Sequence, residues 1–243
     1  MISRAKRIIR GYIRKNLDAL LRFKSFQDYV NNRFYRDGYI IVAERFLQGV
    51  YYSYAGFKFH FCDQLYTIDQ AINDYCYSDI NSSDVVLDIG ANIGGFSLLA
   101  SKRAKQVYAV EPVYADILRK NIVLNRITNI KVLEAGLGIG THDVTFDLDE
   151  CKRRKKRVDL KTLSEILEMV GKCDFLKIDC EGCEWFIDYR ELEGFRRIEG
   201  EVHNFDGKHN FTSFEGILAK AGFKYEVVRN SEQTYLIHAF KRI

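Results

Sequence analysis

The alternation of apolar and polar stretches along the chain predicts buried strands separated by helices. Residues 85–89 form a short apolar run rich in β-branched residues, which is typical of a strand buried on both faces of a parallel sheet. Three glycines follow between positions 90 and 95, and a helical pattern opens at Phe96. A strand, a glycine-rich turn and a helix form the first unit of a doubly wound sheet, in which backbone can approach a ligand at the helix N-terminus.

The same kind of pattern continues toward the C-terminus. Thr162 and Glu165 have the spacing of a capping box ahead of a helix. The last two apolar runs, at 224–229 and 234–240, are joined by four residues, which is too short for a parallel crossover. We therefore predict an α/β fold: a Rossmann-like doubly wound sheet that is mostly parallel and ends in an antiparallel hairpin. The other predicted strands span 106–110, 130–135, 174–178 and 197–202, and further helices are predicted at 116–126 and 212–221.

The N-terminal part of the chain predicts an extension made of helices and a hairpin. Residues 1–24 have apolar positions at helical spacing and basic residues over much of the rest, as in an amphipathic helix. Aromatic residues alternate at 57, 59 and 61, as in one strand of a hairpin, and residues 65–77 have a helical pattern. We predict that residues 1–80 form this extension, as a cap over the mouth of a ligand site, and that 81–243 form the main domain.

Composition narrows the class of protein. The 243 residues are 47% hydrophobic and 29% charged, which describes a globular chain with one large α/β domain and an extension. The net charge of +4 is too small to indicate a nucleic-acid binder. No apolar run approaches the ~18 residues that a membrane-spanning helix needs, and the start lacks the apolar core of a signal peptide. We therefore expect a cytoplasmic protein. The basic N-terminal helix could still contact a membrane or RNA, although packing on its own domain is the preferred interpretation.

The cysteines predict no metal site. Cys180 and Cys183 have a metal-ligand spacing, but no second pair of cysteines or histidines lies at a matching distance. We therefore expect the six cysteines of the chain to be reduced and mostly buried thiols.

The glycine-rich turn favours one cofactor over another. A dinucleotide fingerprint needs a second glycine two residues after Gly90, and this chain has Asn92 there. Glu111 ends the next apolar run, where a carboxylate can accept hydrogen bonds from the hydroxyls of a ribose. A site that binds a ribose but binds a pyrophosphate only weakly fits S-adenosylmethionine (SAM) better than NAD.

A run of six basic residues at 152–157 is the strongest hint of a polyanionic partner. The run follows a short strand predicted at 144–146, and we expect it to form a loop. Because no aromatic residues are interleaved with it, a solvated surface loop is the preferred interpretation and phosphate binding is the alternative.

Four motifs resemble the FkbM family of SAM-dependent methyltransferases. The resemblance spans about 85–205, and its most specific part is Lys-Ile-Asp-x-Glu-Gly-x-Glu, in which Cys180 and Cys183 occupy the two variable positions. It implies transfer of a methyl group to a hydroxyl of a sugar, glycan or other small molecule. The motifs are Leu-Asp-Ile-Gly-Ala-Asn-Ile-Gly-Gly-Phe at 87–96, Val-Glu-Pro at 110–112, Leu-Lys-Ile-Asp-Cys-Glu-Gly-Cys-Glu at 176–184, and Glu-Val-His at 201–203.

The resemblance also implies roles for individual residues. Asp179 would lie nearest the transferred methyl group, with Glu181, Glu184, Glu201 and His203 around the acceptor. His203 is our first choice for the base, because an ordinary histidine pKa of about 6.5 suits proton abstraction near neutrality, and Asp179 is the second choice. The cofactor would be held by Asp88, Gly90, Asn92 and Gly94 at its methionine part, by Glu111 at the ribose and by Glu134 at the adenine.

Three alternatives stay open at this point. The basic N-terminus and the basic run would suit an RNA methyltransferase, although no Asn-Pro-Pro-Tyr type signature of base N-methylation is present. Carboxylates near Asp179 could hold Mg²⁺ for metal-assisted O-methylation. The chain could also be a SAM-binding or nucleotide-binding module without catalysis. The sequence specifies neither the acceptor nor an oligomeric state.

Overall fold

The computed structural model describes residues 40–43, 50–60, 66–149, 152–229, 231 and 233–241. The helix predicted at 1–24 lies outside these residues. The chain divides into two compact units, Met1–Cys62 and Asp63–Ile243. The segment 63–80, which we assigned to the extension, therefore lies in the second unit. The predicted domain division at residue 80 stays a prediction.

The first unit contains a three-stranded antiparallel sheet, formed by β1 (Ile40–Ala43), β2 (Val50–Tyr54) and β3 (Phe57–His60) in that order. Ala55 and Gly56 connect β2 to β3 with φ angles of 49° and 80°, and two positive φ angles are typical of a tight hairpin turn. Phe57 and Phe59 are buried while their neighbours are partly exposed. The predicted hairpin strand with alternating aromatic residues is therefore confirmed for 57–60.

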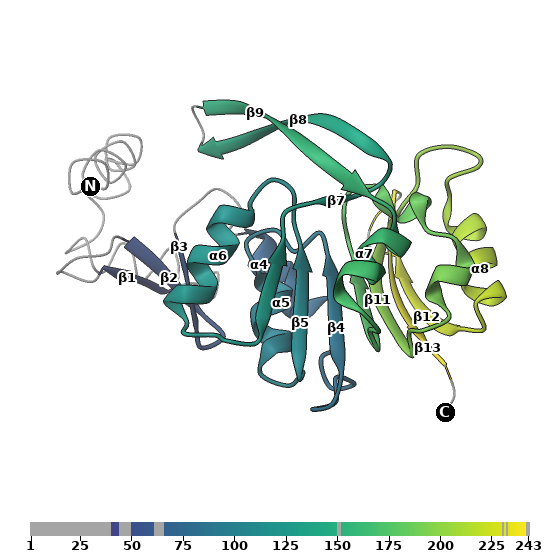
Figure 1. Cartoon of the computed structure of the whole chain (residues 1–243), viewed down its shortest axis with the longest axis horizontal. Coiled ribbons are helices and arrows are strands. Elements are labelled where there is room, and N and C mark those ends of the chain that lie inside the picture. Colours follow the sequence, from purple (N-terminus) through teal and green to yellow (C-terminus); the bar gives the residue numbers. More distant parts are fainter. Residues whose placement is uncertain are drawn as a thin grey trace. The chain divides into compact units, whose positions relative to one another are not determined.

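The second unit is built on a seven-stranded sheet (Figure 1). Its strand order is β12-β13-β11-β10-β4-β5-β6, and the neighbours from β11 to β6 are parallel. The last strand, β13, runs antiparallel to both β11 and β12. This is the predicted Rossmann-like arrangement with a C-terminal antiparallel hairpin. The strands are β4 (Val85–Ile89), β5 (Gln106–Val110), β6 (Ile130–Leu133), β10 (Phe175–Ile178), β11 (Arg197–His203), β12 (Lys224–Arg229) and β13 (Thr234–Phe240).

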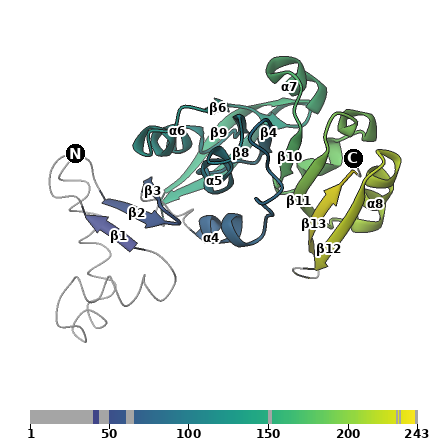
Figure 2. The same cartoon turned by 90° about the horizontal axis from the view of Figure 1, so that it is seen from below.

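Helices cover both faces of this sheet. Figure 2 shows α4 (Tyr66–Asn73) and α5 (Gly95–Ser101) on one face and α7 (Leu163–Val170) on the other. Helix α6 (Ala115–Leu124) follows β5, and α8 (Phe211–Lys220) precedes β12. All four side chains of β10 are buried, because helices pack on both sides of this central strand. The continuous apolar runs in the sequence have the same physical origin. Within the described residues, no helix is long and apolar enough to cross a membrane.

A second small sheet, in the order β7-β9-β8, is inserted between β6 and α7. Its strands are β7 (Gly136–Leu137), β8 (Gly140–Asp149) and β9 (Lys152–Lys161), and the β8–β9 hairpin extends beyond the carboxyl edge of the main sheet (Figure 1). The loop predicted at 152–157 is wrong, because this basic run is part of β9. The register places Asp143 opposite Arg157 and Asp147 opposite Arg153. The pairing with β8 thus makes a strand of a run whose local composition does not indicate one.

Candidate functional site

The carboxyl ends of β4, β5 and β10 open into a cavity of about 760 Å³ within the second unit. This size lies in the range of small-molecule sites. Residues predicted for the site that line the cavity are Gly90, Asn92, Glu111, Asp179, Glu181 and Glu201. Helix α4 with the segment after it, the β8–β9 hairpin and the turn that follows Asp179 also contribute to its wall. Of these, the β8–β9 hairpin was not predicted to lie at the site.

The glycine-rich turn is packed directly against the chain at Asp179. Gly90 has a φ of 77°, and a Cβ built on it would lie 1.8 Å from the backbone oxygen of Asp179. Gly94 caps α5 with a φ of 100°, and Asn92 also has a positive φ of 49°. The turn therefore needs glycine at position 90, both for its conformation and for the close approach of β4 and β10.

Asp88 lies beneath this turn and is completely buried. Its Oδ2 accepts a hydrogen bond of 2.5 Å from the hydroxyl of Ser97, and its Oδ1 lies 3.3 Å from Nζ of Lys177. Lys177 also donates to the backbone oxygen of Gly90 at 2.9 Å. Burial raises the pKa of Asp88, against the opposing charge of Lys177. Among the described residues, Asp88 thus supports the turn from below and is not part of the cavity wall.

Glu111 joins the two loops that surround the cofactor end of the cavity. Its Oε2 accepts the backbone N–H of Asn92 at 2.8 Å, and its Oε1 accepts those of Val113 and Tyr114 at 2.6 and 2.9 Å. Burial raises the pKa of Glu111, and these three hydrogen bonds oppose the rise. A carboxylate offers about four acceptor directions, so three backbone donors leave room for a hydroxyl of a ligand.

Glu134, the residue predicted for the adenine, has other partners. Its Oε1 lies 2.6 Å from Nζ of Lys156, and its Oε2 lies 2.8 Å from Arg119. These two hydrogen bonds lower the pKa of Glu134. Its side chain is 39% exposed, and it is absent from the described residues that line the cavity.

Asp179 directly follows β10 and faces the cavity, where two donors approach one of its oxygens. The hydroxyl of Tyr75 donates to Oδ2 at 2.8 Å, and Nζ of Lys177 lies 3.8 Å from the same atom. Lys177 is the first residue of the Lys-Ile-Asp motif at 177–179, which was the only sequence signal for it. Nothing in the local sequence indicated that Tyr75, 104 residues away, would contact Asp179.

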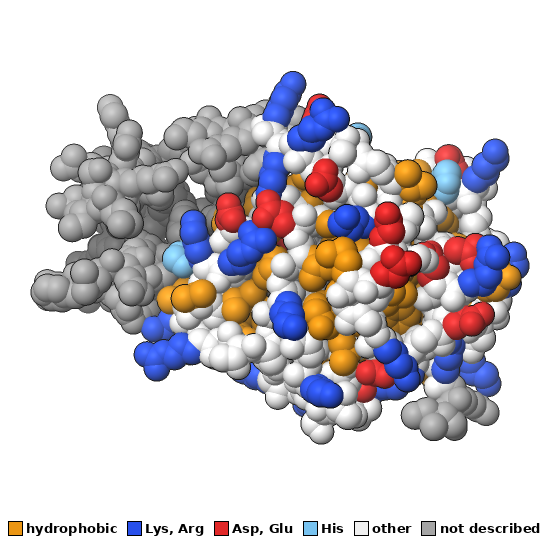
Figure 3. Space-filling model, viewed as in Figure 1, with side chains coloured by type: hydrophobic (Ala, Val, Ile, Leu, Met, Phe, Trp, Pro, Cys, Tyr) orange, Lys and Arg blue, Asp and Glu red, His pale blue; other side chains and the backbone are white. Residues whose placement is uncertain are grey.

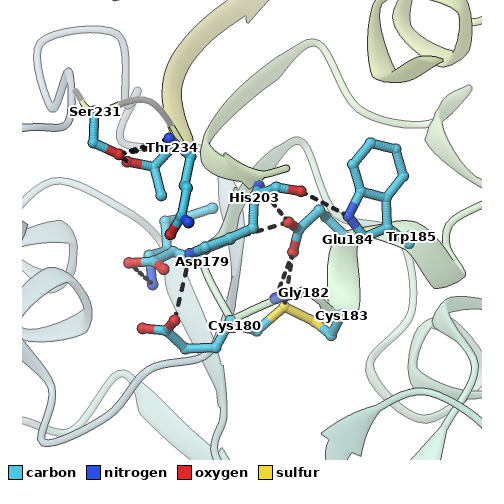
Figure 4. A network of polar contacts seen from close by, with 12 residues as sticks. Asp179, Cys180, Gly182, Cys183, Glu184, Trp185, His203, Ser231 and Thr234 are labelled. Atoms are coloured by element: carbon cyan, nitrogen blue, oxygen red, sulfur yellow. Dashed lines mark hydrogen bonds and ion pairs between the residues drawn. A yellow bond between two sulfur atoms is a disulfide. The ribbon is translucent and has the colours of Figure 1, made fainter. Parts of the chain in front are cut away.

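His203 ends β11 and forms a pair with a buried glutamate. Figure 4 shows Glu184 between His203 and the turn at Gly182. Oε1 of Glu184 accepts a hydrogen bond from Nδ1 of His203 at 3.0 Å, and Nε2 of His203 lies 3.5 Å from Oε2 of Glu181. Burial lowers the pKa of His203, but the hydrogen bond to Glu184 and the nearby carboxylates outweigh burial and raise the pKa to about 9. The imidazole is therefore a stronger base than a free histidine, but it is mostly protonated near neutral pH. The ordinary histidine pKa, on which the choice of His203 as the base rested, is wrong for this residue.

Trp185, the only tryptophan in the sequence, fixes the other side of this pair. Its Nε1 donates to the backbone oxygen of His203 at 3.0 Å. The indole lies edge-on to Phe214 of α8, so it connects the His203 strand to the core. The fluorescence of Trp185 can thus report on this end of the site.

A disulfide between Cys180 and Cys183 lies in the cavity wall (Figure 4). It encloses Glu181 and Gly182, which both have positive φ angles, of 57° and 107°. The prediction that all six cysteines are reduced is therefore wrong for this pair, because the tight turn brings the two sulfur atoms together. Cys76 and Cys173 are free, and Cys173 is buried.

The acceptor end of the cavity contains the donor types of a metal site. Ligand atoms of Asp179, Glu181 and His203 all lie within 4.8 Å of one another. The same three residues are among our candidates for the catalytic group, which also include Glu201. Metal-assisted methylation therefore stays an alternative, in which the ligand atoms of Asp179, Glu181 and His203 would bind a metal ion.

The β8–β9 hairpin supplies an additional wall of the cavity. His142 and Val144 from β8 and Val158 and Leu160 from β9 line it. Alternate residues of a strand share one face, so Lys155 and Arg157 lie on the other face, whereas Lys156 shares the face of Val158 and Leu160. Among the described hairpin residues, those that line the cavity are mainly apolar.

Comparisons with known proteins agree with this architecture. The family described as Methyltransferase FkbM domain matches residues 88–225, which are 138 of the 243 residues. Methyltransferase sdnD of Sordaria araneosa is 28% identical over 165 residues, which cover 47% of this chain and 64% of that protein. A probable ribosomal RNA small subunit methyltransferase A of Methanosphaera stadtmanae is 39% identical over 59 residues, 24% of this chain and 22% of that protein. The chain thus spans less than two thirds of the length of these relatives.

Two solved structures share the fold at low sequence identity. The precorrin-6y C5,15-methyltransferase of Geobacter metallireducens has a TM-score of 0.51 and 17% identity, covering 76% of this chain and 94% of that chain. SMU.1697c, a putative methyltransferase of Streptococcus mutans in complex with SAH, has a TM-score of 0.52 and 14% identity, covering 72% and 97%.

Proposed function

Because the chain belongs to the family of FkbM-domain methyltransferases, we propose that it transfers the methyl group of SAM to a hydroxyl of a sugar, a glycan or another small molecule. The single observation that carries this proposal is that the glycine-rich turn, Glu111 and the carboxylate of Asp179 line one cavity. The pair of His203 and Glu184 borders this cavity: it is not among the described lining residues, but Nε2 of His203 lies 3.5 Å from Glu181, which does line it.

The cofactor end of the cavity fits SAM. Gly90 and Asn92 form the turn at which the methionine part would lie, and Glu111 retains acceptor capacity for a ribose hydroxyl. Asp88 would act through Ser97 and Lys177, which hold the turn from below. Glu134 is not carried into this proposal, because it is paired with Arg119 and Lys156.

When bound, SAM supplies a methyl group on a cationic sulfur. The acceptor oxygen forms a bond to the methyl carbon while the bond from carbon to sulfur breaks, and the electron pair of that bond stays on sulfur. Nε2 of His203 takes the proton of the acceptor hydroxyl, and Glu184 stabilises the resulting imidazolium. Asp179, Glu181 and Glu201 would align the acceptor by accepting hydrogen bonds from its hydroxyls.

The charge distribution argues for a small acceptor over RNA. Two of the described cations of β9 have local partners: Lys156 pairs with Glu134, and Arg157 donates to Thr141. On the face seen in Figure 3, Lys and Arg side chains are interspersed with Asp and Glu side chains. RNA methylation stays the second candidate, and binding that weakens steeply with salt would favour it.

The first experiment is calorimetric titration with SAM, S-adenosylhomocysteine and NAD. We expect binding of the two adenosyl ligands and none of NAD. Transfer of labelled methyl groups is then measured with a panel of methyl glycosides and polyols, with and without a chelator. His203→Gln is expected to lower kcat by about 10²–10⁴-fold with little effect on SAM affinity. Absence of SAM binding would overturn the proposal. Unchanged turnover in His203→Gln would show that His203 is not the base. SAM binding without transfer to any acceptor would favour the non-catalytic alternative.

A further inference from the structure

The geometry points to Tyr75 as a positioning residue that holds the carboxylate of Asp179 at the methyl-transfer end of the cavity. Tyr75 lies in the segment between α4 and β4 and outside the residues 88–225 that match the family. The inference rests on the proposed function, because it gives Tyr75 a task in that reaction.

Tyr75 and Lys177 approach the same oxygen of Asp179. The Tyr75 hydroxyl donates to Oδ2 at 2.8 Å, and the Lys177 ammonium lies 3.8 Å from that atom. Among the described residues, no hydrogen bond reaches the other oxygen, Oδ1. One oxygen of Asp179 is thus fixed by the protein, and the other is left to a ligand in the cavity.

The Tyr75 ring is itself held firmly. It is 8% exposed and packs edge-on against Phe96 of α5, with ring centroids 5.6 Å apart. Nζ of Lys177 lies 5.6 Å from the centre of the Tyr75 ring. Burial, followed by the charge of Asp179, raises the pKa of Tyr75 well above its usual value. The hydroxyl therefore stays protonated near neutral pH and is a donor there.

Fixing Asp179 matters because methyl transfer requires the acceptor oxygen, the methyl carbon and the sulfur to lie in line. Misplacement of a positioning group by about 1 Å can cost about 10²-fold in rate. Without the Tyr75 hydroxyl, the Asp179 carboxylate can turn toward Lys177. We therefore expect its loss to affect turnover more than cofactor affinity.

Tyr75→Phe is the variant of choice, and Tyr77→Phe is its matched control. Tyr77 lies two residues away and stacks on the same Phe96, but its hydroxyl donates to the backbone oxygen of Ala71. We expect Tyr75→Phe to lower kcat by about 10-fold or more, with a SAM Kd within about two-fold of wild type. Tyr77→Phe should change neither quantity by more than about two-fold.

A second measurement needs no acceptor. The ratio of SAM to S-adenosylhomocysteine affinities is measured by calorimetry for the wild type, Tyr75→Phe, Asp179→Asn and the double variant. A charged Asp179 senses the sulfonium, so Tyr75→Phe is expected to change this ratio, and to cause no further change when Asp179→Asn is already present. A purely structural role for Tyr75 would give the same change in both backgrounds.

The outcomes separate this inference from the function on which it rests. The role of Tyr75 would be overturned if Tyr75→Phe and Tyr77→Phe had equal kcat and SAM affinity. It would also be overturned if the effect of Tyr75→Phe persisted in the presence of Asp179→Asn. In both cases SAM binding and methyl transfer by the wild type would still stand. A wild type that does not bind SAM would overturn both.

Discussion

Oε1 of Glu184 accepts two hydrogen bonds from one residue: the backbone N–H of His203 at 2.7 Å and its Nδ1 at 3.0 Å. Because a carboxylate can only accept, Nδ1 carries the proton, and Nε2 is the nitrogen left for proton transfer. Glu184 is fully buried, so this pair is shielded from solvent. The orientation of the proposed base is therefore set by a residue that is not itself in the cavity wall.

Glu184→Gln should lower the pKa of His203 from about 9 toward the ordinary value of about 6.5, because the variant removes the hydrogen-bonded charge that outweighs burial. NMR titration of the imidazole measures this change directly. The rising limb of the pH–rate profile should move to lower pH with it.

The matched control is Asp206→Asn, since Asp206 makes the same kind of pair with His209 at 3.0 Å on the surface. It should leave the titration of His203 unchanged. If the pKa of His203 is the same in Glu184→Gln as in the wild type, Glu184 does not control this base.

Stability should depend on pH through His203. The pKa of its folded form is raised from 6.5 to about 9, so the protonated form is favoured by folding. This contribution is fully present below pH ~6.5 and is lost as the pH rises through about 9. Urea unfolding at several pH values should thus show a difference between wild type and His203→Gln that shrinks over this window. A difference that grows with pH would contradict the assignment.

Glu111→Ala is expected to weaken SAM binding and to destabilise the fold at the same time. The substitution leaves three backbone N–H groups without their acceptor, and each unsatisfied buried donor costs about 1–3 kcal/mol. Urea unfolding and calorimetry measure the two effects.

Glu134→Ala is the useful comparison for Glu111→Ala. Its two ion pairs are partly exposed, and such pairs contribute about 0–1 kcal/mol each. We expect a small loss of stability and unchanged SAM affinity. A large loss of SAM affinity would restore Glu134 as the adenine contact.

Gly90 and Gly222 form a natural pair for testing the turn. Their φ angles are 77° and 79°, but a Cβ at Gly222 would meet nothing within 4 Å, whereas one at Gly90 would lie 1.8 Å from the Asp179 oxygen. Gly222→Ala should cost about 1–2 kcal/mol from backbone strain alone. Gly90→Ala should cost about 1–3 kcal/mol more and abolish SAM binding. Equal costs in urea unfolding would show that the turn does not need this close approach.

Reducing the Cys180–Cys183 disulfide should loosen the turn that carries Glu181. A dithiol such as dithiothreitol converts the bond to two thiols and is itself oxidised. For so short a loop, the expected loss is about 2 kcal/mol of stability. Thiol titration and urea unfolding report the change, and the fluorescence of Trp185 reports whether it reaches His203.

Two variants control the reduction experiment. Cys183→Ser should be as stable as the reduced wild type and insensitive to reductant, whereas Cys173→Ser removes a buried free thiol and should keep the response. If the number of titratable thiols in the unfolded wild type does not rise by two when reductant is added, the expectation fails.

Local sequence patterns were sufficient for much of the fold. The runs at 106–110, 224–229 and 234–240 coincide with β5, β12 and β13, since buried strands need continuous or alternating apolar residues. The capping box at Thr162 and Glu165 and the helix stop before Gly222 are also present. These features depend on interactions between residues close in the chain, which is why the sequence displays them.

The basic run at 152–157 shows where local patterns are insufficient. Its composition indicates a solvated loop, but its conformation is decided by backbone pairing with β8. The disulfide was missed for a related reason, because a Cys-x-x-Cys spacing alone does not show whether the turn brings the sulfur atoms together.

The sequence by itself determined the family, the positions of the main-sheet strands along the chain, and the edge of the sheet at which Asp179, Glu201 and His203 would gather. Carboxyl ends of parallel strands meet at one edge, so the motif positions were enough for this. Only the tertiary structure decided which of these residues face the cavity, that Glu111 holds both loops, and that Tyr75 reaches Asp179 across 104 residues. Those contacts arise from packing between distant segments, and the free energy of such packing depends on shapes and distances that no local pattern records.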